Sequence, residues 1–169
     1  RPDLLYAASE KISDTKGETI AIFGQVTAEL MDGLELAGYV TYPKGKAETG
    51  LPMVVMPHGG PIGIRDTWGF DDDAQMLAAA GYAVLQVNFR GSGGYGKAFM
   101  DAGAREWGGR MQDDLTDATR WAIDQRIADA GRICIYGASY GGYAALMGVA
   151  KEPGLYRCAV GYIGVYDLP

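Results

Sequence analysis

Ser139 lies in the pentapeptide 137–141, which reads Gly-Ala-Ser-Tyr-Gly and fits the pattern G-x-S-x-G. An apolar run, 132–136, precedes the pentapeptide, and a helix-like run, 140–151, follows it. A serine at such a strand-to-helix turn is held in a strained backbone conformation, and the flanking glycines remove Cβ atoms where the two elements meet. The pattern is typical of a nucleophile elbow, whose serine hydroxyl attacks an acyl carbon.

Acyl transfer also needs hydrogen-bond donors for the oxyanion, and the chain offers two candidates. The backbone N–H of Tyr140 follows the serine directly, as the elbow requires. The sequence His58-Gly59-Gly60 comes directly after another short apolar run and matches the start of an oxyanion loop, whose glycines let backbone N–H groups approach the substrate. We therefore expect the N–H groups of Gly60 and Tyr140 to form the oxyanion hole.

Strand-like and helix-like runs alternate along the chain after an antiparallel start. Such alternation predicts an α/β architecture, here an α/β-hydrolase fold with a mainly parallel sheet, an antiparallel N-terminal hairpin and an incomplete C-terminal part. The hairpin is expected over residues 26–43, with its turn at Asp32-Gly33. The other expected strands are 51–56, 83–89, 132–136 and 158–165, and the expected helices are 74–80, 113–128 and 140–151.

His58 is the only histidine in the chain, which makes it a candidate general base. In an α/β-hydrolase, however, the acid and the base follow the serine in chain order, and His58 precedes Ser139. We interpret its imidazole as a support of the oxyanion loop. After Ser139 there is no histidine, and Asp167 is the only aspartate. We interpret Asp167 as a loop or helix-cap residue, so the triad acid and base are expected outside this chain.

The segment 91–96, Gly-Ser-Gly-Gly-Tyr-Gly, formally matches the dinucleotide-binding pattern G-x-G-x-x-G, with Asp113 and Asp114 downstream. The match follows a middle strand, and its glycines do not lead into a clear helix. We therefore interpret this loop, including Tyr95, as close packing beside the active site. No cofactor and no metal are expected.

Composition and charge exclude several classes of partner. The net charge of −6, without a cluster of Lys and Arg, argues against nucleic-acid binding, and no apolar run is long enough to span a membrane. Cys134 and Cys158 fall in apolar runs, so we expect both to be buried and reduced. Reduced cysteines hint at a reducing compartment, the cytoplasm. The sequence is compatible with a homo-oligomer and with a monomer.

With these motifs the chain resembles the prolyl oligopeptidase family of serine peptidases, in particular its acylaminoacyl-peptidase and dipeptidyl-peptidase-like branch. The resemblance rests on four stretches that together span most of the chain: 32–36 (DGLEL), 58–61 (HGGP), 88–96 (NFRGSGGYG) and 137–143 (GASYGGY). It implies that Ser139 is the nucleophile and that the Gly60 and Tyr140 amides bind the oxyanion. It also implies an N-terminal β-propeller that gates access to short peptides.

The propeller and the C-terminal part of the catalytic domain are not in this sequence. We thus expect residues 1–24 to be a leading segment and residues 25–169 to be the N-terminal part of a catalytic domain. The predicted function is hydrolysis of short or N-blocked peptides through an acyl-enzyme on Ser139, in a longer protein that supplies the acid and the base. The alternatives are a carboxylesterase of the same fold, since elbow and oxyanion loop serve esters and amides alike, and a non-catalytic piece that only pairs with the rest of its protein.

Overall fold

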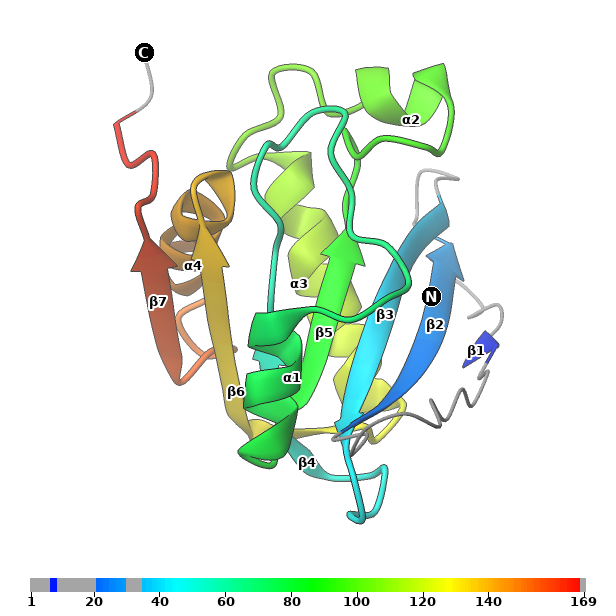
Figure 1. Ribbon diagram of the computed structural model, residues 1–169. Coiled ribbons are helices and arrows are strands. Elements are labelled where there is room, and N and C mark those ends of the chain that lie inside the picture. Colours follow the sequence, from blue (N-terminus) through cyan, green and yellow to red (C-terminus); the bar gives the residue numbers. More distant parts are fainter. Residues whose placement is uncertain (1–6, 9–20, 30–34, 168–169) are drawn as a thin grey trace.

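The computed structural model describes residues 7–8, 21–29 and 35–167, with side chains from residue 35 onward (Figure 1). The strands of these ranges form one mixed sheet in the order β1-β2-β3-β5-β4-β6-β7. The strands are β1 (Ala7–Ala8), β2 (Ala21–Glu29), β3 (Glu35–Pro43), β4 (Leu51–Val55), β5 (Ala83–Asn88), β6 (Ala128–Ala138) and β7 (Cys158–Tyr162). The helices are α1 (Asp72–Ala79), α2 (Lys97–Asp101), α3 (Arg110–Asp124) and α4 (Tyr140–Lys151).

The sheet changes direction at β5. Strands β2 and β3 pair antiparallel, and β3 also pairs antiparallel with β5. From β5 the pairs β5–β4, β4–β6 and β6–β7 are all parallel. This confirms the predicted α/β-hydrolase arrangement of a hairpin followed by parallel strands. The turn expected at Asp32-Gly33 lies outside the described residues, and β2 begins at Ala21, within the expected leading segment.

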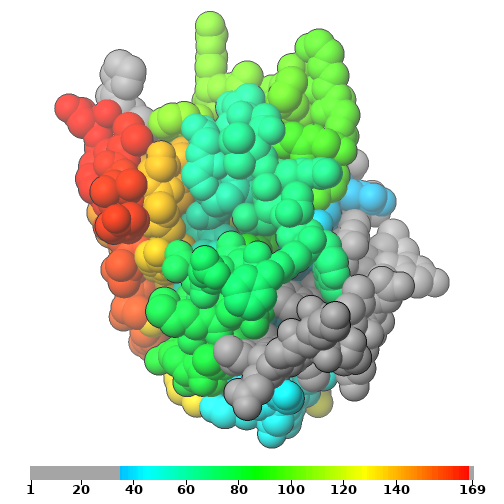
Figure 2. Space-filling model, viewed as in Figure 1, coloured from blue at the N-terminus to red at the C-terminus, as the bar shows by residue number. Residues whose placement is uncertain are grey.

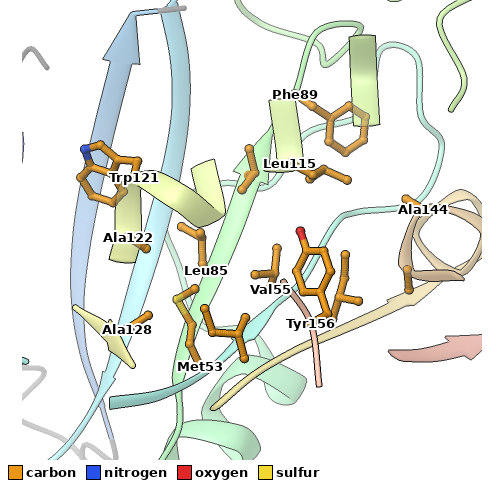
Figure 3. Packing of buried hydrophobic residues seen from close by; sticks show 14 of the residues in the cluster. Met53, Val55, Leu85, Phe89, Leu115, Trp121, Ala122, Ala128, Ala144 and Tyr156 are labelled. Atoms are coloured by element: carbon orange, nitrogen blue, oxygen red, sulfur yellow. The ribbon is translucent and has the colours of Figure 1, made fainter. Parts of the chain in front are cut away.

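Helices cover both faces of the sheet. Helix α1 lies on one face, and α3 and α4 lie on the other, as Figure 1 shows. Between the sheet and α3, Met53, Leu85 and Leu115 are fully buried in one apolar cluster (Figure 3). Burying each such side chain contributes about 1.5–3 kcal/mol, so this cluster fixes the strands whose ends carry the site.

Element boundaries differ from expectation where glycines or polar residues obscure the pattern. Helix α1 begins at Asp72 because the Asp71 carboxylate accepts a hydrogen bond from the Ala74 N–H at 2.8 Å and caps it. Helix α2 was not expected. Helix α3 runs Arg110–Asp124 rather than 113–128, because Arg126 adopts a φ of 61° and the chain then enters β6.

The expectation for the two cysteines is wrong. Cys134 and Cys158 form a disulfide, with their Cα atoms 4.7 Å apart. The reason is register, since the two residues face each other in the parallel β6–β7 pair. Neither cysteine is fully buried: Cys134 is half-buried, and Cys158 is exposed because within the described chain β7 has a neighbour on one side only. The compartment argument from reduced cysteines therefore no longer holds.

Candidate active site

Ser139 occupies the sharp turn between the end of β6 and the first residue of α4. Its backbone has φ 55° and ψ −122°, a conformation that a side chain with a Cβ adopts only when its surroundings impose it. The Ser139 N–H donates to the Tyr162 carbonyl at 3.0 Å, and its carbonyl accepts from the Gly142 N–H at 3.0 Å. The strained strand-to-helix turn predicted from the pentapeptide is thus present.

The glycines of the elbow lie in direct contact with backbone. A Cβ atom built on Gly137 would lie 2.5 Å from the Gly141 carbonyl carbon, and one on Gly141 would lie 2.2 Å from the Pro57 oxygen. Real Cβ atoms do not approach backbone so closely, so both positions require glycine. Because Pro57 follows β4, this packing seats the elbow against the start of the loop that carries the His58-Gly59-Gly60 sequence.

That loop passes beside Ser139. A Cβ on Gly59 would lie 3.4 Å from the Ser139 Cβ and 4.0 Å from its hydroxyl oxygen, so the glycine backbone lies next to the serine. Gly60, the next residue, has a φ of 122°, which glycine alone adopts freely. In the space-filling view of Figure 2 the loop, coloured teal, lies along one face beside the gold and orange region of β6 and α4.

His58 is held by groups other than Ser139. Its Nε2 lies 2.9 Å from the Ser92 hydroxyl, its Nδ1 lies 2.8 Å from the Gly59 carbonyl oxygen, and its ring stacks on Phe89 with centroids 4.3 Å apart. Burial lowers the pKa of His58, against the opposing effect of the bond to Gly59. Because the Gly59 carbonyl can only accept, Nδ1 carries a proton, while the single proton of the Ser92 hydroxyl lies within hydrogen-bond reach of both His58 Nε2 and the Phe89 carbonyl oxygen, 2.7 Å away. Both nitrogens therefore have loop partners.

The Tyr140 side chain points into the core, so only its backbone N–H is available at the elbow. The ring is 1% exposed and packs against Trp107, Phe89 and Tyr143 at centroid distances of 4.9, 5.5 and 5.8 Å. Burial raises the pKa of its hydroxyl, which stays protonated. This aromatic packing fixes the first turn of α4 behind Ser139.

The loop of residues 91–96 packs against the loop that carries Gly59 and Gly60. The Gly63 N–H donates to the Gly91 carbonyl at 2.9 Å, and the Gly93 N–H donates to the Ile64 carbonyl at 2.9 Å. The Tyr95 hydroxyl accepts a hydrogen bond from the amide of Asn88, the last residue of β5, at 2.8 Å. A short helix, α2, does follow Gly96 directly, but it is only five residues long.

Sequence reasoning missed a buried ion pair beneath this loop. The Arg90 guanidinium donates to both Asp114 carboxylate oxygens, from Nη2 at 2.7 Å and from Nε at 2.9 Å, and the Arg90 N–H donates to the same group at 2.8 Å. Both side chains are almost fully buried. The carboxylate that the dinucleotide pattern would use for a ribose is thus engaged by arginine. The one signal for this ion pair in the sequence was Arg90 itself, a charged residue directly after the apolar run 83–89.

Two further polar residues, Asn88 and Asp66, were also missed. Asn88 ends β5, is fully buried and hydrogen-bonds the backbone of Asp66. Burial, followed by the nearby charge of Asp71, raises the pKa of the Asp66 carboxyl to about 7. Nothing in the linear sequence pairs residues 66 and 88.

Within residues 7–8, 21–29 and 35–167, no cluster of three or more His, Cys, Asp or Glu side chains is arranged to hold a metal ion. In the same ranges no helix is both long and apolar enough to cross a bilayer.

With this geometry established, comparison with known proteins places the chain in a family. Residues 68–169 match the prolyl oligopeptidase family. Dipeptidyl aminopeptidase BIII of Pseudoxanthomonas mexicana is 40% identical over 97% of this chain, and the acylamino-acid-releasing enzyme of Sus scrofa is 34% identical over 76% of it. The chain belongs to the prolyl oligopeptidase family, as its motifs indicated.

Solved structures agree on the fold. A crystal structure of a puromycin hydrolase superposes with a TM-score of 0.82 and 28% identity over 92% of this chain. The acylaminoacyl peptidase of Pyrococcus horikoshii superposes with a TM-score of 0.74 and 30% identity over 83% of it. The chain spans 24% of the length of both dipeptidyl aminopeptidase BIII and the puromycin hydrolase, and 18% of the Sus scrofa enzyme.

Proposed function

We propose that this chain carries the nucleophile and the oxyanion hole of a serine peptidase that hydrolyses short or N-blocked peptides. The observation that carries the proposal is the strained backbone of Ser139, with a φ of 55°, directly beside the glycine backbone of the loop 58–60. A strained serine next to a glycine-lined loop is the arrangement that acyl transfer requires.

In the proposed reaction the Ser139 hydroxyl oxygen attacks the peptide carbonyl carbon and gives its proton to a base. The carbonyl oxygen becomes an oxyanion, which the backbone N–H groups of Gly60 and Tyr140 stabilise. The base returns the proton to the leaving amine, the C–N bond breaks and an acyl-enzyme remains. Water then repeats the sequence and releases the acid. Each donor of such a hole contributes about 2.7–4 kcal/mol of transition-state stabilisation.

The base in this proposal is supplied by sequence outside the 169 residues. His58 does not suit the role, because its two nitrogens bond Ser92 and Gly59 and its ring is stacked on Phe89. The relatives are several times longer than this chain, which leaves ample sequence for an acid, a base and a propeller. The peptide substrate class follows from the names of the relatives, a dipeptidyl aminopeptidase and an acylamino-acid-releasing enzyme.

A fluorophosphonate probe tests this proposal, because it labels only an activated serine. We expect stoichiometric labelling of Ser139 in the full-length protein and none in its Ser139→Ala variant. The 169-residue chain alone should label at no more than a trace rate, since a serine without a base retains only the residual catalysis of the oxyanion hole, about 10³–10⁴ over water.

Two outcomes would contradict the proposal. A full-length protein whose Ser139 resists the probe would not be a serine peptidase of this kind. Rapid labelling of the isolated 169-residue chain that is lost in His58→Ala would instead make His58 the base. Comparing kcat/KM for matched peptide amide and ester substrates separates a peptidase from a carboxylesterase.

A further inference from the structure

Asn88 is an unusual residue for its position. It ends β5, follows the apolar residues Val84, Leu85 and Val87, and has no exposed surface. Asparagine is disfavoured in strands, and burying its amide is costly unless the amide finds hydrogen-bond partners. A buried asparagine at the carboxyl end of a central strand therefore needs an explanation in its contacts.

The Asn88 amide bonds both backbone groups of a single loop residue. Its Oδ1 accepts from the Asp66 N–H at 2.8 Å, and its Nδ2 donates to the Asp66 carbonyl at 3.0 Å. The second Nδ2 hydrogen is donated to the Tyr95 hydroxyl at 2.8 Å. Both N–H donors of the amide are thus used. The Asn88 side chain bonds the N–H and the C=O of Asp66, as the backbone of a paired strand would.

The loop that Asn88 holds carries Gly59 and Gly60. Between Gly60 and Asp66 the loop makes two further backbone bonds to the segment that follows β5, through Gly63 to Gly91 and through Ile64 to Gly93. At its start, His58 bonds Ser92 of the same segment. Residues 88–95 therefore form a scaffold along the whole oxyanion loop, and the Asn88–Asp66 pair closes its far end.

The link from this scaffold to Gly60 is direct. The Ile64 side chain packs onto Gly60 so closely that a Cβ built there would lie 2.8 Å from the Ile64 Cγ1. The backbone of Ile64 is bonded to Gly93, and Asp66, two residues on, is bonded to Asn88. Loss of the Asp66 bonds would remove the anchor two residues beyond the side chain that packs on Gly60.

We propose that Asn88 is a positioning residue of the active site, which holds the oxyanion loop through the backbone of Asp66 so that the Gly60 N–H faces the developing oxyanion. This inference rests on the proposed function of the Gly60 N–H. Asn88 does not touch the substrate. Its loss weakens binding of the transition state, which carries the oxyanion, more than binding of the substrate.

The first test is kinetic and uses the full-length protein with a peptide anilide. Asn88→Leu keeps the size and burial of the side chain and removes all three hydrogen bonds. We expect kcat to fall about 10- to 100-fold, as a misplaced catalytic group does, with KM within about twofold. Affinity for a peptide aldehyde, which forms an oxyanion adduct, should fall in parallel with kcat/KM.

Gln86→Leu is the matched control. Gln86 lies two residues earlier on the same strand and is 5% exposed, so the variant makes the same change from a buried amide to an apolar side chain away from the loop end. We expect its kcat and KM to stay within about twofold of the parent. Equal losses of kcat in the two variants would mean that β5 tolerates no replacement of a buried amide by an apolar side chain. That result would overturn the proposal.

The second test needs no activity. Hydrogen exchange resolved at single amides should find the Asp66 N–H protected in the unaltered protein and exchanging at least tenfold faster in Asn88→Leu, with the β5 amides unchanged. Fast exchange of Asp66 in the unaltered protein overturns the proposal, even if the variant fails to fold. A protected Asp66 amide in a protein whose Ser139 resists fluorophosphonate would refute the proposed function instead, and a folded Asn88→Leu with full kcat would refute the positioning role alone.

Discussion

The Asp66 carboxyl group makes the stability of the folded chain depend on pH. Its Oδ2 is buried and has no hydrogen-bond partner among the described residues, which accounts for the desolvation that dominates its shift. With a pKa of about 7 in the folded chain against 3.8 as the ordinary value, the folded state binds more protons than the unfolded state between these pH values. The free energy of unfolding must therefore fall as pH rises through that window.

We predict that Asp66→Asn removes this pH dependence. The variant should gain stability over the parent as pH rises from about 4 to 7, and the gain should level off above that at on the order of 1–3 kcal/mol, since partial contact with solvent reduces the effect. Urea unfolding of both proteins at several pH values measures the difference. A difference that does not change with pH would show that the Asp66 carboxyl titrates normally.

The residues that could be predicted from sequence are those whose chemistry is local. The strained turn at Ser139 was predicted because glycines two positions on either side are required where strand and helix backbones touch. Asn88, Asp66, Arg90 and Asp114 were missed because their partners lie 22 to 24 positions away and only folding brings them together. Cys134 and Cys158 were misjudged for the same reason, since the register of β6 and β7 decides their pairing.

At the scale of elements, the apolar periodicity predicted the bounds of a helix correctly where the residues at its ends mark them clearly. Helix α4 begins and ends at the predicted residues, because the elbow serine precedes it and its apolar face is continuous. Helix α3 was placed too late, because Gly108 and Gly109 hide its start and Ile127 and Ala128 continue a helical spacing after the chain has turned. Helix α2 is too short to show a period.

The Arg90–Asp114 pair connects the loop after β5 to α3, and we predict that breaking it lowers the folding stability strongly. Asp114→Ala leaves the buried Arg90 guanidinium without its carboxylate, which costs about 3–5 kcal/mol of folding stability for pairs of this kind. The matched control is Asp101→Ala, which removes the aspartate of the exposed Lys97–Asp101 pair and should cost at most about 1 kcal/mol.

Thermal or urea unfolding measures both variants. Similar small losses in the two would mean that Arg90 finds another partner or water, and that the pair does not anchor the loop.

At the scale of the molecule, the parallel side of the sheet ends in an apolar surface. Strand β7 pairs only with β6 within the described chain, and Val160, Tyr162 and Ile163 are 53, 58 and 72% exposed. A long apolar edge of this kind favours association with other chains. The 169-residue chain is therefore predicted to self-associate as its concentration rises.

Sedimentation velocity over a dilution series measures this tendency. Val160→Lys should reduce the association, while Phe70→Lys, at a residue that is 75% exposed outside the β7 surface, should not. A chain that stays monomeric throughout would show that the β7 surface does not associate.

The Cys134–Cys158 disulfide also determines how the chain is connected. Cys134 lies before Ser139 and Cys158 lies after it, so the elbow and all of α4 are enclosed in a covalent ring with a sequence separation of 24. A proteolytic cut between residues 139 and 157 opens the ring but leaves both products joined. On a gel without reductant the nicked protein migrates as one chain, and only reduction reveals that the backbone around Ser139 has been broken.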